Sequence, residues 1–525
     1  MKSKILTAII TVIFLAALAM ALGVAAQDNA TQNHKTTHHT YKLVDLGTFG
    51  GPQSYFVNDG VPSGSDLNNG GMLTGFADTS AADPFPPFCF NGDCFVSHAF
   101  QWKNGVRTDL GVLHDGLSSA TIGISANGLI AGFADNGEID PNVPVGFPPG
   151  FPELRAVIWR NGEITDLGVL PEGGTESVAN ALNSRGQVVG AALNTIADPN
   201  SIVLCCLNAV APFALQTRAF LWDEENGMQD LGTLGGTDAM ATLINDKGQV
   251  VGFSYTGSNQ AGACFPLATD SFIWEKEKGM TDLGSFGGTC TVAGAVNNRG
   301  QVVGSSNVPG DLFGRAFLWE HGSFQDLGGS LGGNGTGASA INDHGQVVGA
   351  ANLAGETFFH ASLWRHVGEI TDLGTLGSDT CSFASSINAR GQVVGDSKPG
   401  CGPDSDRGFL WENGSIFDLN TLIPAGSALY LQFIDTINDR GEITGTGADV
   451  SGNEHAFLLI PCDENHPGIE GCDYSPVDAA TAAEVSPNVW RRNPNAEVNV
   501  AQKNLLRNRF GRRFALPGPR PVPQN

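Results

Sequence analysis

The sequence predicts an all-β protein, an eight-bladed β-propeller in which each blade holds four strands. Three observations lead to this prediction. A nine-residue phrase recurs eight times, two further phrases recur in step with it, and residues before the first copy supply a strand that the last copy lacks. Repeats of this length with several strands each are typical of propellers and solenoids.

The nine-residue phrase has the pattern of two strands joined by a tight turn. Its clearest copies read INDKGQVVG, from Ile244 to Gly252, and INDHGQVVG, from Ile341 to Gly349. Asn, Asp and Gly before a Val-rich segment supply the backbone angles that a hairpin turn needs. Successive copies lie 45 to 62 residues apart. The other copies are Leu67 to Gly75, Ile124 to Gly132, Leu182 to Gly190, Val296 to Gly304, Ile387 to Gly395 and Ile437 to Gly445.

Two further phrases follow each copy in a fixed order, an Ala-Phe-Leu-Trp-like segment and then Asp-Leu-Gly. The Trp residues are Trp102, Trp159, Trp222, Trp274, Trp319, Trp364 and Trp411, and the eighth unit has Ala456 to Leu459 instead. The Asp residues are Asp109, Asp166, Asp230, Asp282, Asp326 and Asp372, with the variant at Asp418 and an additional copy at Asp45 before the first unit.

Each unit offers four short strands. In the sixth unit they are Ala338 to Asn342, Gln346 to Gly349, Ala361 to Trp364 and Glu369 to Leu373. β-branched and aromatic residues bounded by Gly, Asn and Asp are the pattern of strands. The first strand is rich in small residues, as an inner strand crowded around a central axis should be. Four strands in each unit match one propeller blade.

The two ends of the repeat region complement each other. Tyr41 to Leu46 is a fourth strand without a blade, and the last unit stops after its third strand at Leu459. Pairing the N-terminal strand with the last repeat closes the ring and leaves no sheet edge over. An open β-solenoid is the alternative, because neither of its ends needs the other.

The N-terminus has the pattern of a signal peptide over residues 1–26. Lys2 and Lys4 precede an apolar run, and Val24-Ala25-Ala26 offers small residues for cleavage. A membrane anchor is the alternative interpretation of the apolar run. We therefore expect a secreted, extracellular protein without a membrane span after signal cleavage; the periplasm and the cell surface are further options for its location.

Three segments follow the signal peptide. Residues 27–40 are predicted to be a flexible linker, residues 41–461 hold the propeller, and residues 462–525 form a disulfide loop and a largely disordered basic tail. The net charge of −25 argues against nucleic acid as a partner of the main body, because such binding needs a basic face. The tail could dock onto the acidic body, contact an anionic cell surface or stay solvated.

The combined HAFLW-like, DLGTLGG and AINDxGQVVG segments resemble the HAF repeat of bacterial extracellular proteins. The resemblance covers about Tyr41 to Pro461, and it implies export and a repeated β-fold, with no established activity or catalytic residues. The first two copies and the eighth depart from the pattern, the eighth with Glu442 in place of Gln. Divergent terminal units are usual in repeat proteins.

The ten cysteines fit an oxidising compartment. Plausible bridges are Cys89–Cys94, Cys264–Cys290, Cys381–Cys401 and Cys462–Cys472, although the connectivity does not follow from sequence alone. Cys205 and Cys206 are adjacent, and a vicinal bridge or two separate partners both stay open.

No residue of the sequence is assigned to catalysis, to a cofactor or to a metal. Common catalytic motifs and phosphate-binding loops are absent from the sequence, and the recurring Asp and Asn residues are interpreted as caps of backbone groups. The recurring His residues, such as His98, His360 and His455, are interpreted as packed within the blades.

Insertions follow the second strand in the first four units, and their aromatic residues either bind a glycan or protein or pack over the ring itself. The leading hypothesis is a non-catalytic extracellular binding or surface-interaction module, with a glycan or a protein as partner. A polysaccharide-acting hydrolase or lyase and a purely structural protein are the alternatives. Carboxylates near the axis with raised pKa values would favour the enzyme.

Overall fold

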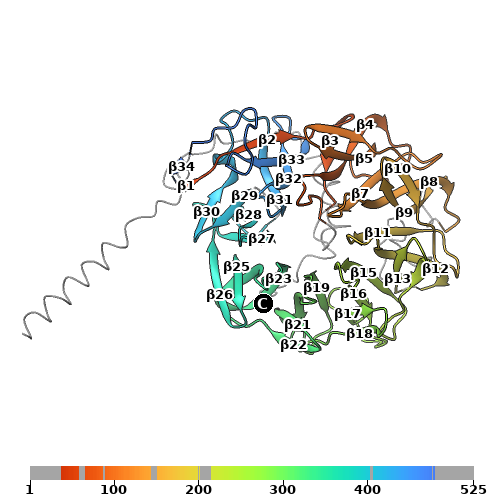
Figure 1. Ribbon diagram of the computed structural model, residues 1–525. Coiled ribbons are helices and arrows are strands. Elements are labelled where there is room, and N and C mark those ends of the chain that lie inside the picture. Colours follow the sequence, from red (N-terminus) through yellow and green to blue (C-terminus); the bar gives the residue numbers. More distant parts are fainter. Residues whose placement is uncertain are drawn as a thin grey trace, which may run out of the picture.

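The protein is described here from a computed structural model, which covers residues 37–57, 65–86, 89–142, 150–198, 200–201, 215–402, 406–475 and 477–478. Eight four-stranded antiparallel sheets stand in a ring around a central axis (Figure 1). The predicted eight-bladed β-propeller is therefore confirmed. The predicted signal peptide, Cys205, Cys206 and the basic tail beyond residue 478 lie outside the described residues.

Each of the first seven blades is a continuous stretch of chain. The first four blades comprise β3 (Gly50–Tyr55), β4 (Leu73–Ala82), β5 (Phe95–Lys103) and β6 (Val106–Asp109); β7 (Ser119–Ile124), β8 (Ile130–Ile139), β9 (Pro152–Arg160) and β10 (Glu163–Asp166); β11 (Ser177–Leu182), β12 (Val188–Ala197), β13 (Leu215–Asp223) and β14 (Gly227–Asp230); β15 (Ala239–Ile244), β16 (Val250–Tyr255), β17 (Thr269–Glu275) and β18 (Gly279–Asp282). Blades 5 to 7 comprise β19 (Thr291–Val296), β20 (Val302–Asn307), β21 (Gly314–Glu320) and β22 (Ser323–Asp326); β23 (Gly332–Ile341), β24 (Val347–Leu353), β25 (Phe359–His366) and β26 (Glu369–Gly374); β27 (Cys381–Ile387), β28 (Val393–Lys398), β29 (Arg407–Glu412) and β30 (Ser415–Asp418), followed by the short 3-10 helix η1 (Leu419–Thr421).

The eighth blade joins the two ends of the repeat region. It consists of β31 (Tyr430–Ile437), β32 (Ile443–Ala448), β33 (Glu454–Pro461) and the N-terminal strand β2 (Tyr41–Asp45). Strand β2 pairs antiparallel with β33, with Tyr41 opposite Pro461 and Asp45 opposite Phe457. The predicted closure is confirmed. A two-residue pairing of β1 (Thr37–His38) with β34 (Val477–Asp478) lies outside the blades.

The first blade departs from the regular unit in its inner strand. The equivalent strand in the other blades runs directly into the Asn-containing turn, whereas β3 ends at Tyr55, well before that turn. Leu67, just before the turn, forms only an isolated bridge with Leu73. The sequence therefore places the turn of this blade correctly, but the main part of its inner strand comes from residues further upstream.

The last glycine of the nine-residue phrase packs against the inner strand in every blade. A Cβ at this glycine would overlap or crowd a backbone carbonyl of the first strand, for example that of Val292 at Gly304 and that of Gly337 at Gly349. In several blades it would also meet a strand-three ring, as at Gly252, where Phe272 lies 2.8 Å from the Cβ position. Steric exclusion therefore explains why this glycine recurs in all eight copies.

The core is divided among the junctions between blades. Each of the eight junctions, including that between the eighth and first blades, contains a cluster of buried apolar side chains. Between blades 3 and 4, for example, Leu221 packs with Val250 and Phe272. Because each blade buries both of its faces against neighbours, the closing strand β2 is needed to complete the last junction.

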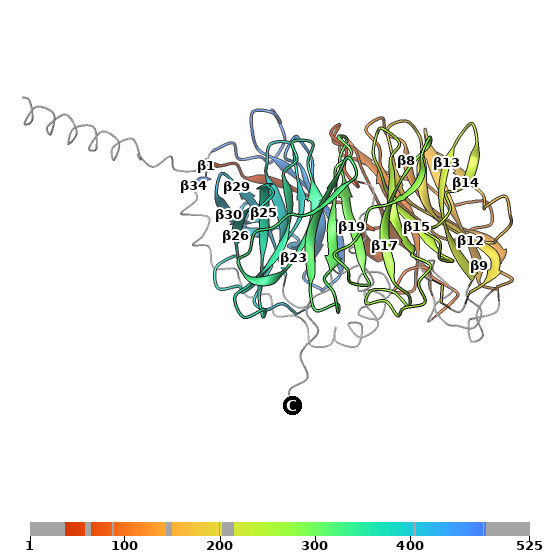
Figure 2. The same cartoon turned by 90° about the horizontal axis from the view of Figure 1, so that it is seen from below.

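The ring has two distinct faces, which Figure 2 shows edge-on. We call the face that carries the turns between strands one and two, and between strands three and four, the turn face. The opposite one is the insertion face, because the insertions after strand two lie there. No helix in the described part of the chain is long and apolar enough to cross a membrane.

Candidate functional site

In seven of the eight blades an Asn opens the turn between strands one and two and links its blade to the next one; blade 2 has Ser125 at this position. The Asn297 side-chain amide donates to the backbone carbonyl of Asn342 at 3.0 Å, and its oxygen accepts from the backbone N–H of Gln301. The same side chain to carbonyl bond joins Asn68 to Ser125, Asn183 to Asn245, Asn245 to Asn297, Asn342 to Asn388, Asn388 to Asn438 and Asn438 to Asn68. The Asn residues thus have a structural role around almost the entire axis.

The second position of the turn makes a parallel set of bonds. The carboxylate of Asp246 accepts from the backbone N–H of Ser184 at 2.9 Å, and that of Asp343 accepts from the N–H of Asn298 at 2.9 Å. Asp439 accepts from Ala389 in the same way. These carboxylates therefore hold the backbone of the preceding blade.

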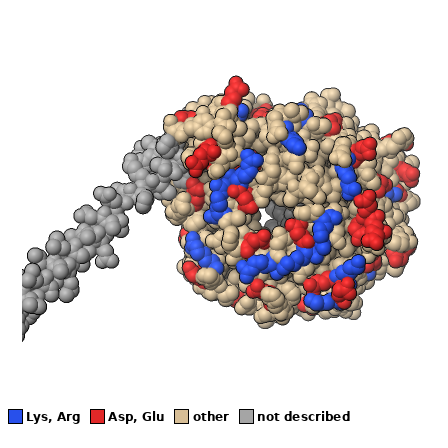
Figure 3. Space-filling model, viewed as in Figure 1, with Lys and Arg blue, Asp and Glu red and all other residues tan. Residues whose placement is uncertain are grey.

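The third position of the turn projects outward and is basic in six consecutive blades. Five of these residues are exposed, and the sixth, Arg440, is partly buried, with 41% of its side chain exposed. Figure 3 shows Lys and Arg gathered around the central hollow, with Asp and Glu between them. We call the six residues at the third position of the turn the basic arc; they are Arg185, Lys247, Arg299, His344, Arg390 and Arg440.

The arginines of the basic arc lie over the turn glycine of the next blade. A Cβ at Gly345 would be 3.4 Å from Nη1 of Arg299, and one at Gly441 would be 2.9 Å from Nη2 of Arg390. Both glycines also have positive φ angles, 83° and 86°. Glycine is thus required here for two reasons: the backbone has a positive φ angle, and a guanidinium occupies the space that a side chain would need.

The cations of the arc are only partly neutralised by carboxylates. Arg185 donates to the amide oxygen of Gln187 at 2.9 Å, and the Lys247 ammonium donates to the backbone carbonyl of Arg299 at 3.2 Å. The guanidinium of Arg299 lies 3.8 Å from Glu320, and this exposed pair is weak. An arc of accessible positive charge therefore surrounds the hollow of an acidic protein.

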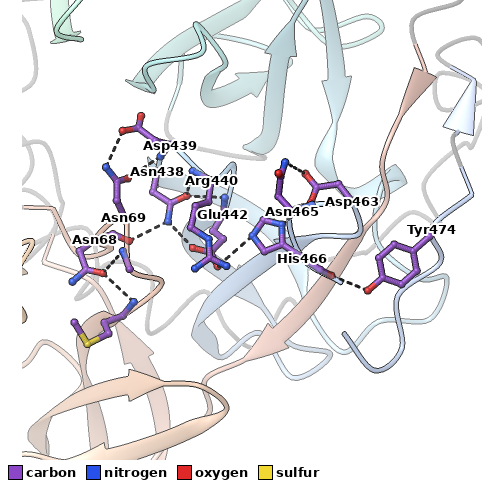
Figure 4. Close-up of polar contacts among 12 residues, drawn as sticks. Asn68, Asn69, Asn438, Asp439, Arg440, Glu442, Asp463, Asn465, His466 and Tyr474 are labelled. Atoms are coloured by element: carbon purple, nitrogen blue, oxygen red, sulfur yellow. Dashed lines mark hydrogen bonds and ion pairs between the residues drawn. The ribbon is translucent and has the colours of Figure 1, made fainter. Parts of the chain in front are cut away.

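The seam between blades 8 and 1 has its own polar cluster, drawn in Figure 4. Glu442 replaces the Gln of other copies, is buried and accepts from the Asn438 amide at 2.6 Å. Arg440 lies 3.4 Å from this carboxylate, and Nε2 of His466 lies 3.6 Å from it. His466 is held from the other side by Asp463, at 2.7 Å from Nδ1. The loop after β33 thus covers the buried carboxylate at the seam.

The Asp of Asp-Leu-Gly has the capping role that its place beside a turn suggests. Asp282, for example, accepts from the backbone N–H of Gly284 at 2.7 Å. In seven blades this Asp also faces a basic residue at the start of strand three. The pairs are His98–Asp109, Arg155–Asp166, Arg218–Asp230, Arg315–Asp326, His360–Asp372, Arg407–Asp418 and His455–Asp45.

The fourth blade is the exception to this charge pairing. Asp270 takes the position of the basic residue, and burial together with the charge of Asp282 raises its pKa. The recurring His residues, which the sequence suggested were packed within the blades, lie largely buried beside these Asp residues and are hydrogen-bonded to them; the His360 side chain is 18% exposed.

One buried carboxylate pair has the property that would favour an enzyme. Burial and the nearby carboxyl of Asp93 raise the pKa of Asp78 to about 8. However, Asp78 is fully buried, and its oxygens accept from the Gln53 backbone N–H at 3.0 Å, from Ser97 Oγ at 3.0 Å and from Asn91 Nδ2 at 3.1 Å. These contacts leave no room for a substrate on Asp78.

The residue of blade 2 that is equivalent to Asp78 also bonds to the backbone. Asp135 accepts from the backbone N–H groups of Leu117 and Ser118, both at 2.7 Å. Both carboxylates therefore tie the start of an inner strand, and we interpret the Asp78 pair as structural. Among the described residues there is no group of three or more His, Cys, Asp or Glu side chains arranged to hold a metal ion.

The insertion face is held by disulfides and by aromatic pairs. Cys89–Cys94, Cys264–Cys290 and Cys381–Cys401 hold this face, whereas Cys462–Cys472 closes the loop after β33, which lies on the turn face beside Glu442. All four are pairs that the sequence made plausible. The insertion residue Phe85 packs with Phe151 at 5.2 Å between ring centroids, and Phe253 stacks on Phe265 at 4.8 Å. These aromatic side chains pack over the blades, which favours a packing role for the insertions over the binding of a glycan or protein. Phe88 and residues 147–149 lie outside the described part.

Sequence reasoning missed the basic arc, although its signal was present. Aligning the eight turns shows a basic residue at the third position in six of them. The alignment could not show that these side chains, more than 250 residues apart at the extremes, converge on one hollow.

Comparison with known proteins adds only fold-level similarity. No protein-family model matches the chain, and no curated protein does. The β-propeller domain of the Trilobed protease from Pyrococcus furiosus aligns at 12% identity and a TM-score of 0.39, over 73% of this chain and 97% of that one. The acylaminoacyl peptidase of Pyrococcus horikoshii aligns at 11% identity and a TM-score of 0.37, over 74% of this chain and 57% of that one. A protein of unknown function from Dyadobacter fermentans aligns at 9% identity and a TM-score of 0.31, over 80% and 99%. These values carry no argument about activity or ligand.

Proposed function

We propose that the protein is a non-catalytic binding module that acts outside the cell and takes its ligand on the basic arc. The observation that carries the proposal is the contrast between the positions of one turn. The Asn and Asp positions are used for bonds between blades, whereas the third position presents an exposed basic side chain in six consecutive blades.

The extracellular location is part of the proposal. Four disulfides are typical of proteins that fold in an oxidising compartment. The signal-peptide pattern of residues 1–26 and the resemblance to HAF-repeat proteins support the same location.

A rigid scaffold supports binding without chemistry. The arginines of the arc are held by the next blade's turn, and the turns are joined by hydrogen bonds almost all the way around the axis. Preorganised charged side chains lose little freedom when a ligand binds, which favours affinity.

The test is a glycan array probed with the purified, secreted protein, together with a depolymerisation assay on the same glycans. We expect binding to some glycans and no release of reducing ends. Absence of binding to every glycan and to extracellular proteins would overturn the proposal.

The alternative function, a polysaccharide hydrolase or lyase, gains no support from Asp78, because this carboxyl owes its raised pKa mainly to burial and is bonded to Gln53, Ser97 and Asn91. Depolymerisation that is lost in an Asp78→Asn variant with an unchanged melting temperature would favour this candidate over the binding module.

A further inference from the structure

We infer that the ligand of the basic arc is an acidic polysaccharide, a linear chain of sugars bearing carboxylate groups, which lies along the mouth of the central hollow. This inference deepens the proposed function and rests on it. The charge of the arc, its extent and the polar groups between its cations support it.

The charge of the arc selects an anion. The whole chain carries a net charge of −25, yet Lys and Arg gather around the hollow on this face (Figure 3). Arg185 and Lys247 have neutral oxygen atoms as hydrogen-bond partners. Guanidinium groups bind carboxylates through two parallel hydrogen bonds, and the partly exposed arginines keep donors free for such contacts.

The extent of the arc selects a polymer. One basic side chain from each of blades 3 to 8 points to the same rim, so a small anion would meet only a few of them. A chain with a charge on each sugar can engage several at once, and each later contact forms at a high effective concentration. Blades 1 and 2 have Gly70 and Asn127 at this position, which leaves the arc open for the chain to enter and leave.

The groups between the cations select a sugar. The carboxylates of Asp246, Asp343 and Asp439 stand in the same turns and are exposed. Each of them uses Oδ1 for a backbone N–H of the preceding blade. Oδ2 of Asp439 also accepts from the Asn69 amide at 2.8 Å, and Oδ2 of Asp246 accepts a long bond of 3.5 Å from the Asn298 amide. A carboxylate oxygen can accept two hydrogen bonds, so these exposed oxygens can also accept from a hydroxyl. Hydroxyl-bearing chains satisfy such acceptors, whereas the denser charge of a nucleic-acid backbone would be repelled by them.

The experiment measures binding of the full secreted chain to polygalacturonate, to a neutral galactan and to polyglutamate, at low and high salt. We expect binding to polygalacturonate that weakens with salt, and little binding to the other two probes. The triple variant Arg185→Gln, Arg299→Gln, Arg390→Gln should lose affinity roughly tenfold, because each exposed charge pair contributes about 0.2–1 kcal/mol.

The matched control removes three exposed cations from outer turns of the same face. It is Lys103→Gln, Lys276→Gln, Lys278→Gln, and it should bind like the wild type. All variants keep the basic tail, so its contribution is the same in each. Because a loss can also follow from misfolding, a gain is tested as well: Asn127→Arg extends the arc and should tighten binding a few-fold.

The outcomes separate the inference from the proposed function. Equal loss in the arc and control triples, or preference for polyglutamate, overturns the acidic polysaccharide. Binding to the neutral galactan that no arc variant changes also overturns it, while leaving a glycan-binding module in place. Absence of binding to any glycan or extracellular protein overturns the proposed function itself.

Discussion

The turn face and the insertion face of the propeller are stabilised by different means. On the turn face the same short turn recurs, and its Asn side chains join neighbouring blades through equivalent hydrogen bonds of 3.0 to 3.1 Å. On the insertion face the loops differ in length from blade to blade, and disulfides and aromatic pairs hold them. The contacts on the turn face are therefore the same from blade to blade, whereas those on the insertion face differ.

This difference has a physical cause. A hydrogen bond between neighbours can be repeated only where every blade places the same groups at the same height, as the nine-residue phrase does. Loops of unequal length cannot share one such pattern of hydrogen bonds. Disulfides stabilise them instead, because a covalent bridge reduces the entropy of the unfolded chain. Ligand recognition by repetition is accordingly expected on the turn face.

The largest expected effect concerns a bridge of the insertion face. Cys264 and Cys290 enclose 26 residues and connect blade 4 to blade 5, whereas Cys89 and Cys94 enclose only 5. Replacing both partners by Ala should lower the free energy of unfolding by about 3.5 kcal/mol for the long bridge and about 2 kcal/mol for the short one. Chemical denaturation of the two double variants measures this, and the reverse order would contradict a loop-entropy origin.

The next effect probes the hydrogen-bonded turns. Asn297→Ala removes the donor to the buried carbonyl of Asn342, and we expect a loss of about 1–3 kcal/mol. Asn298→Ala, at the second position, removes an exposed bond in which Oδ1 accepts from the Asp246 backbone N–H at 3.0 Å, and it should cost only about 0.5–1 kcal/mol. Thermal unfolding followed by calorimetry compares the two variants. Similar losses would show that the buried bonds between blades contribute no special stability.

A smaller effect should come from the one irregular charge pair of the insertion face. Asp270→Arg would place a cation opposite Asp282, as Arg218 stands opposite Asp230 at 2.8 Å in blade 3. We expect a gain of about 0.5–1 kcal/mol, since the pair is partly exposed. Asp270→Asn, which only removes the repulsion, should gain less. A destabilised Asp270→Arg variant in urea denaturation would show that blade 4 requires the acidic residue.

The smallest effect is a pH dependence at the closing strand. The hydrogen bond with Asp45 raises the pKa of His455, while the pKa of Asp45 is lowered because the contacts with His455 and the Gly47 N–H outweigh the effect of burial. The native state thus holds the His455 proton more tightly than the unfolded state does. Its contribution is complete below the unfolded pKa of about 6.5 and is lost as the pH rises through the raised native value.

Comparison with His455→Gln isolates this contribution from that of other groups, Asp78 included. The difference in melting temperature between wild type and variant should shrink as the pH rises from about 6 toward 9. It should also shrink in strong acid, when Asp45 becomes protonated. A difference that is constant with pH would show that the pair does not contribute through its charge.

Much of the fold could be predicted because each copy of the repeat encodes its strands and turn within a few neighbouring residues. The phrase around Asn297 encodes a turn and two strands, and repetition gives the number of blades. The spare strand at Tyr41 and the missing one after Leu459 then predict the closure, since a sheet edge is unfavourable when a partner exists. The repeat could not place the inner strand of blade 1, because β3 lies well upstream of its turn and local patterns do not show which upstream segment returns to the axis.

The candidate site shows where sequence stops being sufficient. The sequence by itself determined the eight repeats, the two-strand turn and the capping role of the recurring Asp residues, because these depend on groups a few residues apart. Only the tertiary structure decided that Arg185 and Arg440 border one hollow, and that Glu442 meets His466 at the seam. Such contacts depend on how the blades close into a ring, which brings together residues that no local pattern connects.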